Sequence, residues 1–154
     1  YPPKNTSELN IFQENKKMFT LLRKPNNTMI SAYYHFNHIL KMSFLDFCDQ
    51  VTDMQTKFLL GYDINSNYQV TNNDFNKIKK LIDERKLIVG IHKTEKMIDI
   101  YNLLELPLDK VDNYILNKKV GVNYRLGDIS SDKKKHIKKL NIYDNLLYDY
   151  VLNS

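Results

Sequence analysis

The sequence predicts an α/β fold in which helices flank a small parallel sheet. Two short apolar runs, residues 18–22 and 87–91, have the length and composition of buried strands. Amphipathic helical patterns alternate with these runs, which is typical of α/β domains. With 154 residues, the chain is expected to form one domain (1–154), with an extended lead-in at 1–16 and a core at 17–152.

The first predicted strand leads through a basic turn into a helix. Arg23 stands at the end of the strand, and Lys24-Pro25 ends it because proline cannot donate to a sheet ladder. Residues 26–28 are typical of turns and helix caps, and apolar residues then recur at helical spacing to about Lys41. Anions bind at this kind of strand–helix junction. Arg23 and Ser31 are therefore candidate anion ligands, and the alternative is a plain βα unit with an ordinary surface arginine.

Helical patterns and turn residues alternate along the rest of the chain. Ser43 is expected to cap a helix that ends near Gln50, and Gly61 to end a helical turn. Thr71-Asn-Asn-Asp74 fits a capping box with Asp in place of the usual Glu. Further helical segments are expected after Thr94, at 111–116, over Asp132 to Leu140 with Ser131 at its start, and after a capping Asn141, with Leu146, Leu147, Tyr150 and Val151 as the buried face of the last one.

Composition limits the classes of partner. The formal charge of +5 suits an anionic ligand, but does not choose between a nucleotide, a polyanionic glycan, nucleic acid and a membrane surface. Because no aromatic-interleaved basic motif or zinc-ligand spacing is present, no nucleic-acid partner is expected. No run approaches the ~20 apolar residues of a membrane span. The single cysteine, Cys48, has apolar neighbours and is expected to be a small buried hydrophobe.

The junction after the first strand reads Phe19-Thr-Leu-Leu-Arg23-Lys-Pro25 and continues as Ile30-Ser-Ala-Tyr-Tyr34. This segment resembles the 3′-phosphate-binding segment of sulfotransferases that use 3′-phosphoadenosine 5′-phosphosulfate (PAPS). The match is closest to the membrane-associated carbohydrate and tyrosine sulfotransferases and their bacterial and viral relatives. Lys24 departs from the usual aspartate of that family, and Thr28 stands where a second arginine is common.

Three further blocks resemble the same family and follow in the same order. They are Asp53–Gly61, which resembles a segment near the acceptor site, the helix–strand–helix region around Gly90, and Ile142–Tyr150. The resemblance implies a P-loop-like sulfotransferase fold. It also implies transfer of a sulfuryl group from PAPS, as co-substrate, to a hydroxyl or amine of a glycan, peptide or small-molecule acceptor.

The resemblance also suggests which residues bind the nucleotide. It implies that Arg23 and Ser31 bind the 3′-phosphate, because a planar guanidinium and a hydroxyl suit that group. His35, one helical turn after the serine, and Arg125, in a loosely matching loop, are the other cofactor-binding candidates. A helix-surface hydroxyl for Ser31 and a satisfied histidine between aromatic residues for His35 are the alternatives. The run Lys133–Lys139 is either a solvated helix face or a patch for an acidic acceptor or for a loop over the nucleotide.

The loop that binds the 5′-phosphosulfate in this family is not visible in the chain. It is a Gly/Ser/Thr-rich turn that belongs before residue 18, and residues 1–17 contain no glycine. The catalytic base of relatives also lies upstream, so no catalytic residue is assigned. The chain is expected to be incomplete at its N-terminus: the nucleotide-binding portion of an enzyme or, alternatively, a non-catalytic structural or assembly subunit with a partner chain. The Golgi lumen is the expected compartment for a eukaryotic family member, and the cytoplasm otherwise.

Overall fold

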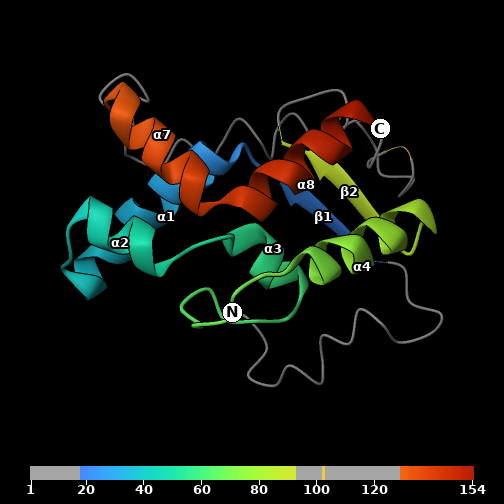
Figure 1. Ribbon diagram of the computed structural model, residues 1–154, viewed down its shortest axis with the longest axis horizontal. Helices are drawn as coiled ribbons and strands as arrows, with labels where there is room; N and C mark the ends of the chain where they lie inside the picture. The colour runs from blue at the N-terminus through green and yellow to red at the C-terminus, as the bar shows by residue number, and fades with distance from the viewer. Residues whose placement is uncertain (1–17, 93–101, 103–128) are drawn as a thin grey trace.

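The chain is described by a computed structural model in which residues 18–92, residue 102 and residues 129–154 are placed (Figure 1). In chain order the described elements are β1 (Met18–Leu22), α1 (Pro25–Leu40), α2 (Phe44–Gln50), α3 (Met54–Leu59), α4 (Asn72–Asp83), β2 (Leu87–Ile91), α7 (Ser131–Leu140) and α8 (Ile142–Asn153). The expected lead-in at 1–16, the helical segments after Thr94 and at 111–116, and Arg125 lie outside the described residues.

The two predicted strands form, and they pair in parallel as predicted. Met18 lies opposite Leu87 and Leu22 opposite Ile91, so the register runs through both strands without a bulge. Helices α1 to α4 connect the strands, and α4 and α8 pack against β2 (Figure 1). The described residues therefore form an α/β arrangement with six helices and a two-stranded parallel sheet.

The prediction that residues 18–22 form a short buried strand is confirmed for the strand, but burial holds for only one face of β1. Leu22 is buried, but Phe19 is 58% and Leu21 37% exposed. Successive side chains of a strand point to opposite faces. Among the described residues, helices cover the face that holds Met18 and Leu22, whereas Phe19 and Leu21 on the other face are exposed.

Local signals explain where the helices begin. Ser43 caps α2, and Thr71 and Asp74 form the predicted capping box of α4. Helix α1 begins earlier than expected, at Pro25, because the missing N–H and fixed φ of proline suit the first helical position. Helix α7 begins at Ser131 and its cap is Ser130, whose hydroxyl accepts from the backbone N–H of Lys133. Gly61 ends the turn after α3 with a φ of +80°, as its position predicts.

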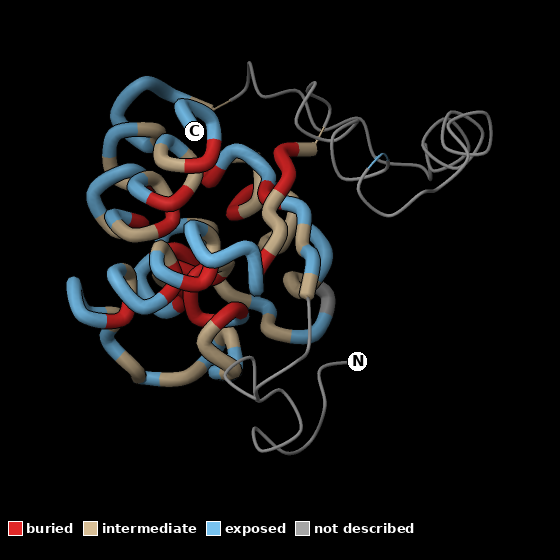
Figure 2. The backbone as a smooth tube through the Cα atoms, turned by 90° about the vertical axis from the view of Figure 1, so that its right-hand side faces the viewer, coloured by how far each residue is buried: buried red, intermediate tan, exposed pale blue. Residues whose placement is uncertain are grey.

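Two apolar cores hold the elements together, and their buried segments lie between the helices in Figure 2. The sheet core joins β1 and β2 to α3, α4 and α8. The helical core joins α1, α2, the start of α3 and α7, and it contains Cys48, which is fully buried as predicted. The sheet core consists of Leu22, Leu59, Ile78, Leu81, Leu87, Ile91, Leu147 and Val151, and the helical core of Met29, Phe47, Cys48, Val51, Met54 and Ile137.

The buried face of α8 is narrower than the sequence predicts. Leu147 and Val151 are buried as predicted and Tyr150 is half-buried, but Leu146 is 44% exposed. Because residues i and i+4 share one helix face, Leu147 and Val151 define the inward side. Leu146 precedes Leu147 by one residue and so lies about 100° around the helix.

Candidate functional site

The structure brings Arg23 and Ser31 together. The guanidinium Nη1 of Arg23 donates to the Ser31 hydroxyl at 3.3 Å, at the carboxyl end of β1. Arg23 is exposed and Ser31, in the second turn of α1, is half-buried. The guanidinium therefore has further N–H groups on the solvent side that can donate to a ligand.

The backbone of Arg23 is fixed by one side chain from α3. The Gln55 amide accepts from the Arg23 N–H at 2.9 Å and donates to the Arg23 carbonyl at 3.0 Å. These two hydrogen bonds satisfy the peptide N–H and carbonyl of Arg23 immediately after β1 ends. Gln55 thus sets the point from which the arginine side chain extends.

The first turn of α1 adds positive potential beside this arginine. The backbone carbonyl of Lys24 accepts from the N–H groups of Asn27 and Thr28, and the first turn contains no acidic residue. The N-terminal end of a helix carries a partial positive charge. The Thr28 hydroxyl donates to the Lys24 carbonyl at 3.3 Å, so its hydrogen atom is bonded within the turn and does not point to a ligand.

The other candidates occupy different positions. His35 is exposed one turn after Ser31 on α1, and its ring meets the edge of Phe36 at 4.8 Å between centroids. Arg125 lies outside the described residues. His136, within the basic run, contacts Asp49 of α2 at 2.9 Å. Apart from the buried Ile137, the residues of that run are exposed or half-buried, as a solvated helix face requires.

Two buried carboxylates that the sequence did not predict hold α3, the helix that carries Gln55, against α8. Asp53 stands at the start of α3, and its carboxylate accepts from the N–H groups of Tyr143 and Asp144 in α8, at 2.8 and 2.9 Å. Conversely, the Asp144 carboxylate accepts from the N–H groups of Gln55 and Thr56 in α3, at 3.1 and 2.8 Å. Each aspartate therefore caps the other's helix.

Asn141 links the two helices in a different way from the predicted one. It stands at the N-cap position of α8, but its side chain makes no capping bond there. Instead it accepts from the Asp53 N–H at 2.9 Å and donates to the Ile137 carbonyl at 2.8 Å. The predicted capping function passes to Asp53, because that carboxylate already satisfies the first N–H groups of α8.

Burial sets the pKa values of this carboxylate pair. It raises the pKa of Asp53 to about 6, and the neighbouring charge of Asp144 adds to the effect, whereas the hydrogen bonds from α8 oppose it. Burial also raises the pKa of Asp144 above its ordinary value, against the hydrogen bonds from Thr56 and Gln55. Both carboxylates titrate at higher pH in the folded protein than in an unfolded chain.

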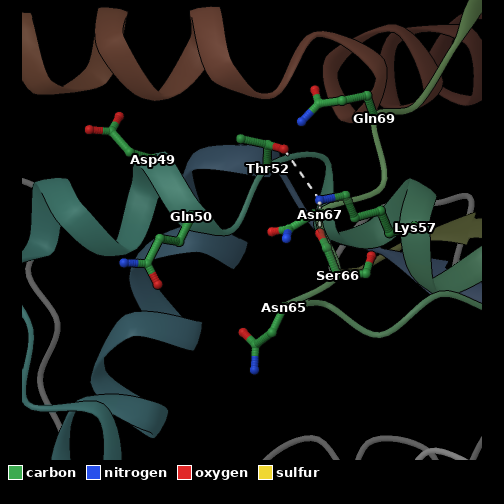
Figure 3. Close-up of a pocket in the computed structure, with 8 residues that line it drawn as sticks. All are labelled: Asp49, Gln50, Thr52, Lys57, Asn65, Ser66, Asn67 and Gln69. Carbon is green, nitrogen blue, oxygen red and sulfur yellow. Dashed lines mark hydrogen bonds between the residues drawn. The ribbon is translucent and has the colours of Figure 1, made fainter.

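Lys57 is a further buried charged residue that the sequence did not reveal. Its side chain is only 1% exposed, and its Nζ donates to the Ser66 carbonyl at 3.1 Å and to the Thr52 hydroxyl at 3.4 Å (Figure 3). Burial lowers the pKa of Lys57, and the charges of Asp53 and Asp144 oppose that change. The lysine forms part of the wall of a polar pocket between α2, α3 and the loop after α3.

The described part of the chain holds no cluster of three or more His, Cys, Asp or Glu residues that could bind a metal ion. None of the helices in this part combines the length and the apolarity needed to cross a bilayer. Comparisons with models of protein families, with curated proteins and with solved structures find no match to this chain.

Proposed function

We propose that this chain is a PAPS-dependent sulfotransferase or the nucleotide-binding portion of one, with the P-loop-like fold of that family. The observation that carries the proposal is the contact between Arg23 and Ser31 at the carboxyl end of β1. Two residues that the resemblance assigns to one phosphate lie within hydrogen-bonding distance of each other. Their position beside the start of α1 also suits an anion.

The side chains of Arg23 and Ser31, called here the Arg23 corner, suit a phosphate that is bound but does not react. A guanidinium binds phosphate through two parallel hydrogen bonds, and a serine hydroxyl adds a neutral one. The Gln55 amide binds both the N–H and the carbonyl of Arg23, so the backbone that carries the arginine side chain is already ordered. Ordering a mobile side chain costs about 0.5–1.5 kcal/mol on binding, and this fixed anchor lowers that cost relative to a free surface lysine.

The proposed reaction is in-line transfer of a sulfuryl group. The acceptor oxygen or nitrogen bonds to sulfur, the bond between sulfur and the phosphate oxygen of PAPS breaks, and a base takes the acceptor proton. The products are the sulfated acceptor and 3′-phosphoadenosine 5′-phosphate. Arg23 and Ser31 hold the nucleotide in this scheme and take no part in bond breaking.

Calorimetry with 3′-phosphoadenosine 5′-phosphate tests the proposal. Arg23→Ala should weaken binding by roughly 1.5–3 kcal/mol, which is the usual contribution of a hydrogen bond to a charged group. Arg85→Asn is the matched control, because it removes one exposed positive charge at a positive-φ position that asparagine tolerates. Absence of binding to the folded wild-type chain, or equal weakening by both substitutions, would reject the site.

One observation favours a non-catalytic alternative. Thr28, which stands where the family commonly has an arginine, donates its hydroxyl to the Lys24 carbonyl and supplies no second positive charge. A structural or assembly subunit would retain the fold without the reaction. A sulfuryl-transfer assay on the full-length gene product distinguishes the two, because nucleotide binding without transfer to any acceptor, together with a stable partner that covers Arg23, supports the subunit.

A further inference from the structure

The polar pocket beside Lys57 has a composition that points to a ligand other than the nucleotide. Its volume is about 280 Å³, slightly below the usual range for drug-sized ligands of ≈ 300–1,000 Å³. No apolar side chain lines it, and four of its eight residues are amides (Figure 3). The lining residues are Asp49, Gln50, Thr52, Lys57, Asn65, Ser66, Asn67 and Gln69.

We propose that this pocket binds a small, neutral, polyhydroxylated molecule, a monosaccharide or polyol. Each amide side chain has N–H donors and a carbonyl acceptor, so it can both donate to and accept from the hydroxyl groups of such a molecule. An apolar ligand would find no apolar side chain on the lining and would bury polar groups without partners. The proposal does not depend on the proposed nucleotide site.

The charges at the pocket already have partners within the protein, which favours a neutral ligand over an ion. Lys57 interacts with the buried carboxylates of Asp53 and Asp144. The Asp49 carboxylate lies 2.9 Å from the His136 ring nitrogen. The lining holds one carboxylate, Asp49, and one ammonium, Lys57, so neither sign of charge is in excess.

The two buried polar groups at the pocket lie behind its surface. The Ser66 hydroxyl is buried and has no hydrogen-bond partner among the described residues. The ammonium of Lys57 has three donors, and the hydrogen bonds found for it go to Thr52 and to the Ser66 carbonyl. Neither group has appreciable accessible surface, so the exposed amides of Asn65, Asn67 and Gln69 are the groups that a ligand in the pocket would contact.

The loop that supplies most of the amides is held in place before any ligand binds. Tyr62 and Tyr68 stack with ring centroids 3.8 Å apart and planes inclined by 12°. The Tyr68 hydroxyl donates to Asp74 at 2.6 Å, which ties the loop to the start of α4. A preorganised loop lowers the entropy that a small ligand must offset on binding.

The pocket and the Arg23 corner lie on different sides of α3. Gln55 points toward the Arg23 backbone, whereas Lys57 points into the polar pocket. Residues two positions apart in a helix differ in direction by about 200°. A ligand in the pocket is thus not placed by the groups that hold Arg23.

Titrations followed by amide resonances test the proposal, with D-glucose, D-galactose and myo-inositol as probes and inorganic sulfate as the anionic comparison. At least one neutral probe should give saturable shifts confined to residues 65–69 and their neighbours, and sulfate should not. Each hydrogen bond lost is expected to weaken binding about fivefold. The double change Asn67→Ala and Gln69→Ala should therefore weaken it about 25-fold, whereas Asn76→Ala, an exposed amide on α4, should leave it unchanged.

Three results would overturn the proposal. These are the absence of saturable shifts with all three neutral probes, shifts at the pocket with sulfate alone, and equal effects of the double change and Asn76→Ala. Asn65→Ala provides an independent check, because it removes an exposed amide of the pocket lining and should weaken binding of the neutral probe about fivefold. Ser66→Ala is a second control, because it removes a buried hydroxyl that a ligand in the pocket does not reach, and it should leave binding unchanged.

Discussion

Replacing Asp144 by alanine should destabilise the protein more than any other single substitution of a carboxylate in the described region. The Asp144 carboxylate accepts from three donors in α3: the Gln55 N–H, the Thr56 N–H and the Thr56 hydroxyl, at 3.1, 2.8 and 2.7 Å. Thr56 is fully buried, so water does not reach its two donors in the folded state. The alanine variant would leave both unsatisfied.

The magnitude follows from these contacts. An unsatisfied buried donor costs about 1–3 kcal/mol, and loss of a helix cap costs about 0.5–2 kcal/mol. Because the same bonds serve both counts and the cavity will partly relax, we expect a loss of about 3–5 kcal/mol in the free energy of unfolding. Asp144→Asn keeps one acceptor oxygen for Thr56 and should cost about half as much.

Urea denaturation followed by far-ultraviolet circular dichroism measures the effect at a pH above the pKa values of the carboxylates. Asp149→Ala is the control, because it removes an exposed carboxylate from the same helix and should change stability by no more than about 0.5 kcal/mol. Equal stability of the Asp144 and Asp149 variants would refute the view that reciprocal capping joins α3 to α8.

Three further predictions concern groups elsewhere in the molecule. Because the pKa of Asp53 in the folded protein is raised from 3.8 to about 6, the native state holds this proton more tightly than the unfolded chain. The free energy of unfolding should thus fall by up to about 1.4 kcal/mol per pH unit as pH rises across this interval. Urea denaturation at a series of pH values should show this fall, with a flatter pH profile for Asp53→Asn. A rise in the free energy of unfolding over the interval would contradict the prediction. Burial, with help from an adjacent carboxylate, raises the pKa of Cys48 to about 12, so iodoacetamide should modify it only after denaturation, and rapid modification of the native protein would disprove its burial. Replacing Lys133, Lys134 and Lys135 together by alanine should reduce nucleotide affinity only at low salt, because exposed charges are screened over about 8 Å at physiological ionic strength; calorimetry at two salt concentrations measures this, and loss of binding at both would move the site to α7.

Sequence reasoning worked where neighbouring residues determine the structure. The two apolar runs became the paired strands, and the Thr71–Asp74 capping box formed as its spacing required. The contact between Arg23 and Ser31 was also predictable, because a strand end followed by a helix brings residues eight apart together. These cases depend on local geometry and on side chains close in sequence.

The same reasoning missed groups whose partners are far along the chain. Asp53 and Asp144 are 91 residues apart, and neither pattern alone indicates that each caps the other's helix. An aspartate at the start of each of two predicted helices is the signal that could have suggested it. Lys57 was missed because its burial depends on Ser66 in a loop with no regular pattern. Phe19 read as buried because an apolar run does not reveal which face of a strand is covered.

The central claim is that Arg23 binds a 3′-phosphate, and the most direct test is the coupling energy between the Arg23 guanidinium and the 3′-phosphate of the nucleotide. Calorimetry would compare 3′-phosphoadenosine 5′-phosphate with adenosine 5′-monophosphate, which lacks the 3′-phosphate, on the wild-type chain and on Arg23→Ala. The wild type should prefer 3′-phosphoadenosine 5′-phosphate by about 10- to 150-fold, the equivalent of roughly 1.5–3 kcal/mol for a hydrogen bond to a charged group, and Arg23→Ala should lose nearly all of that preference. An equal preference in both proteins, or no preference in the wild type, would contradict the claim.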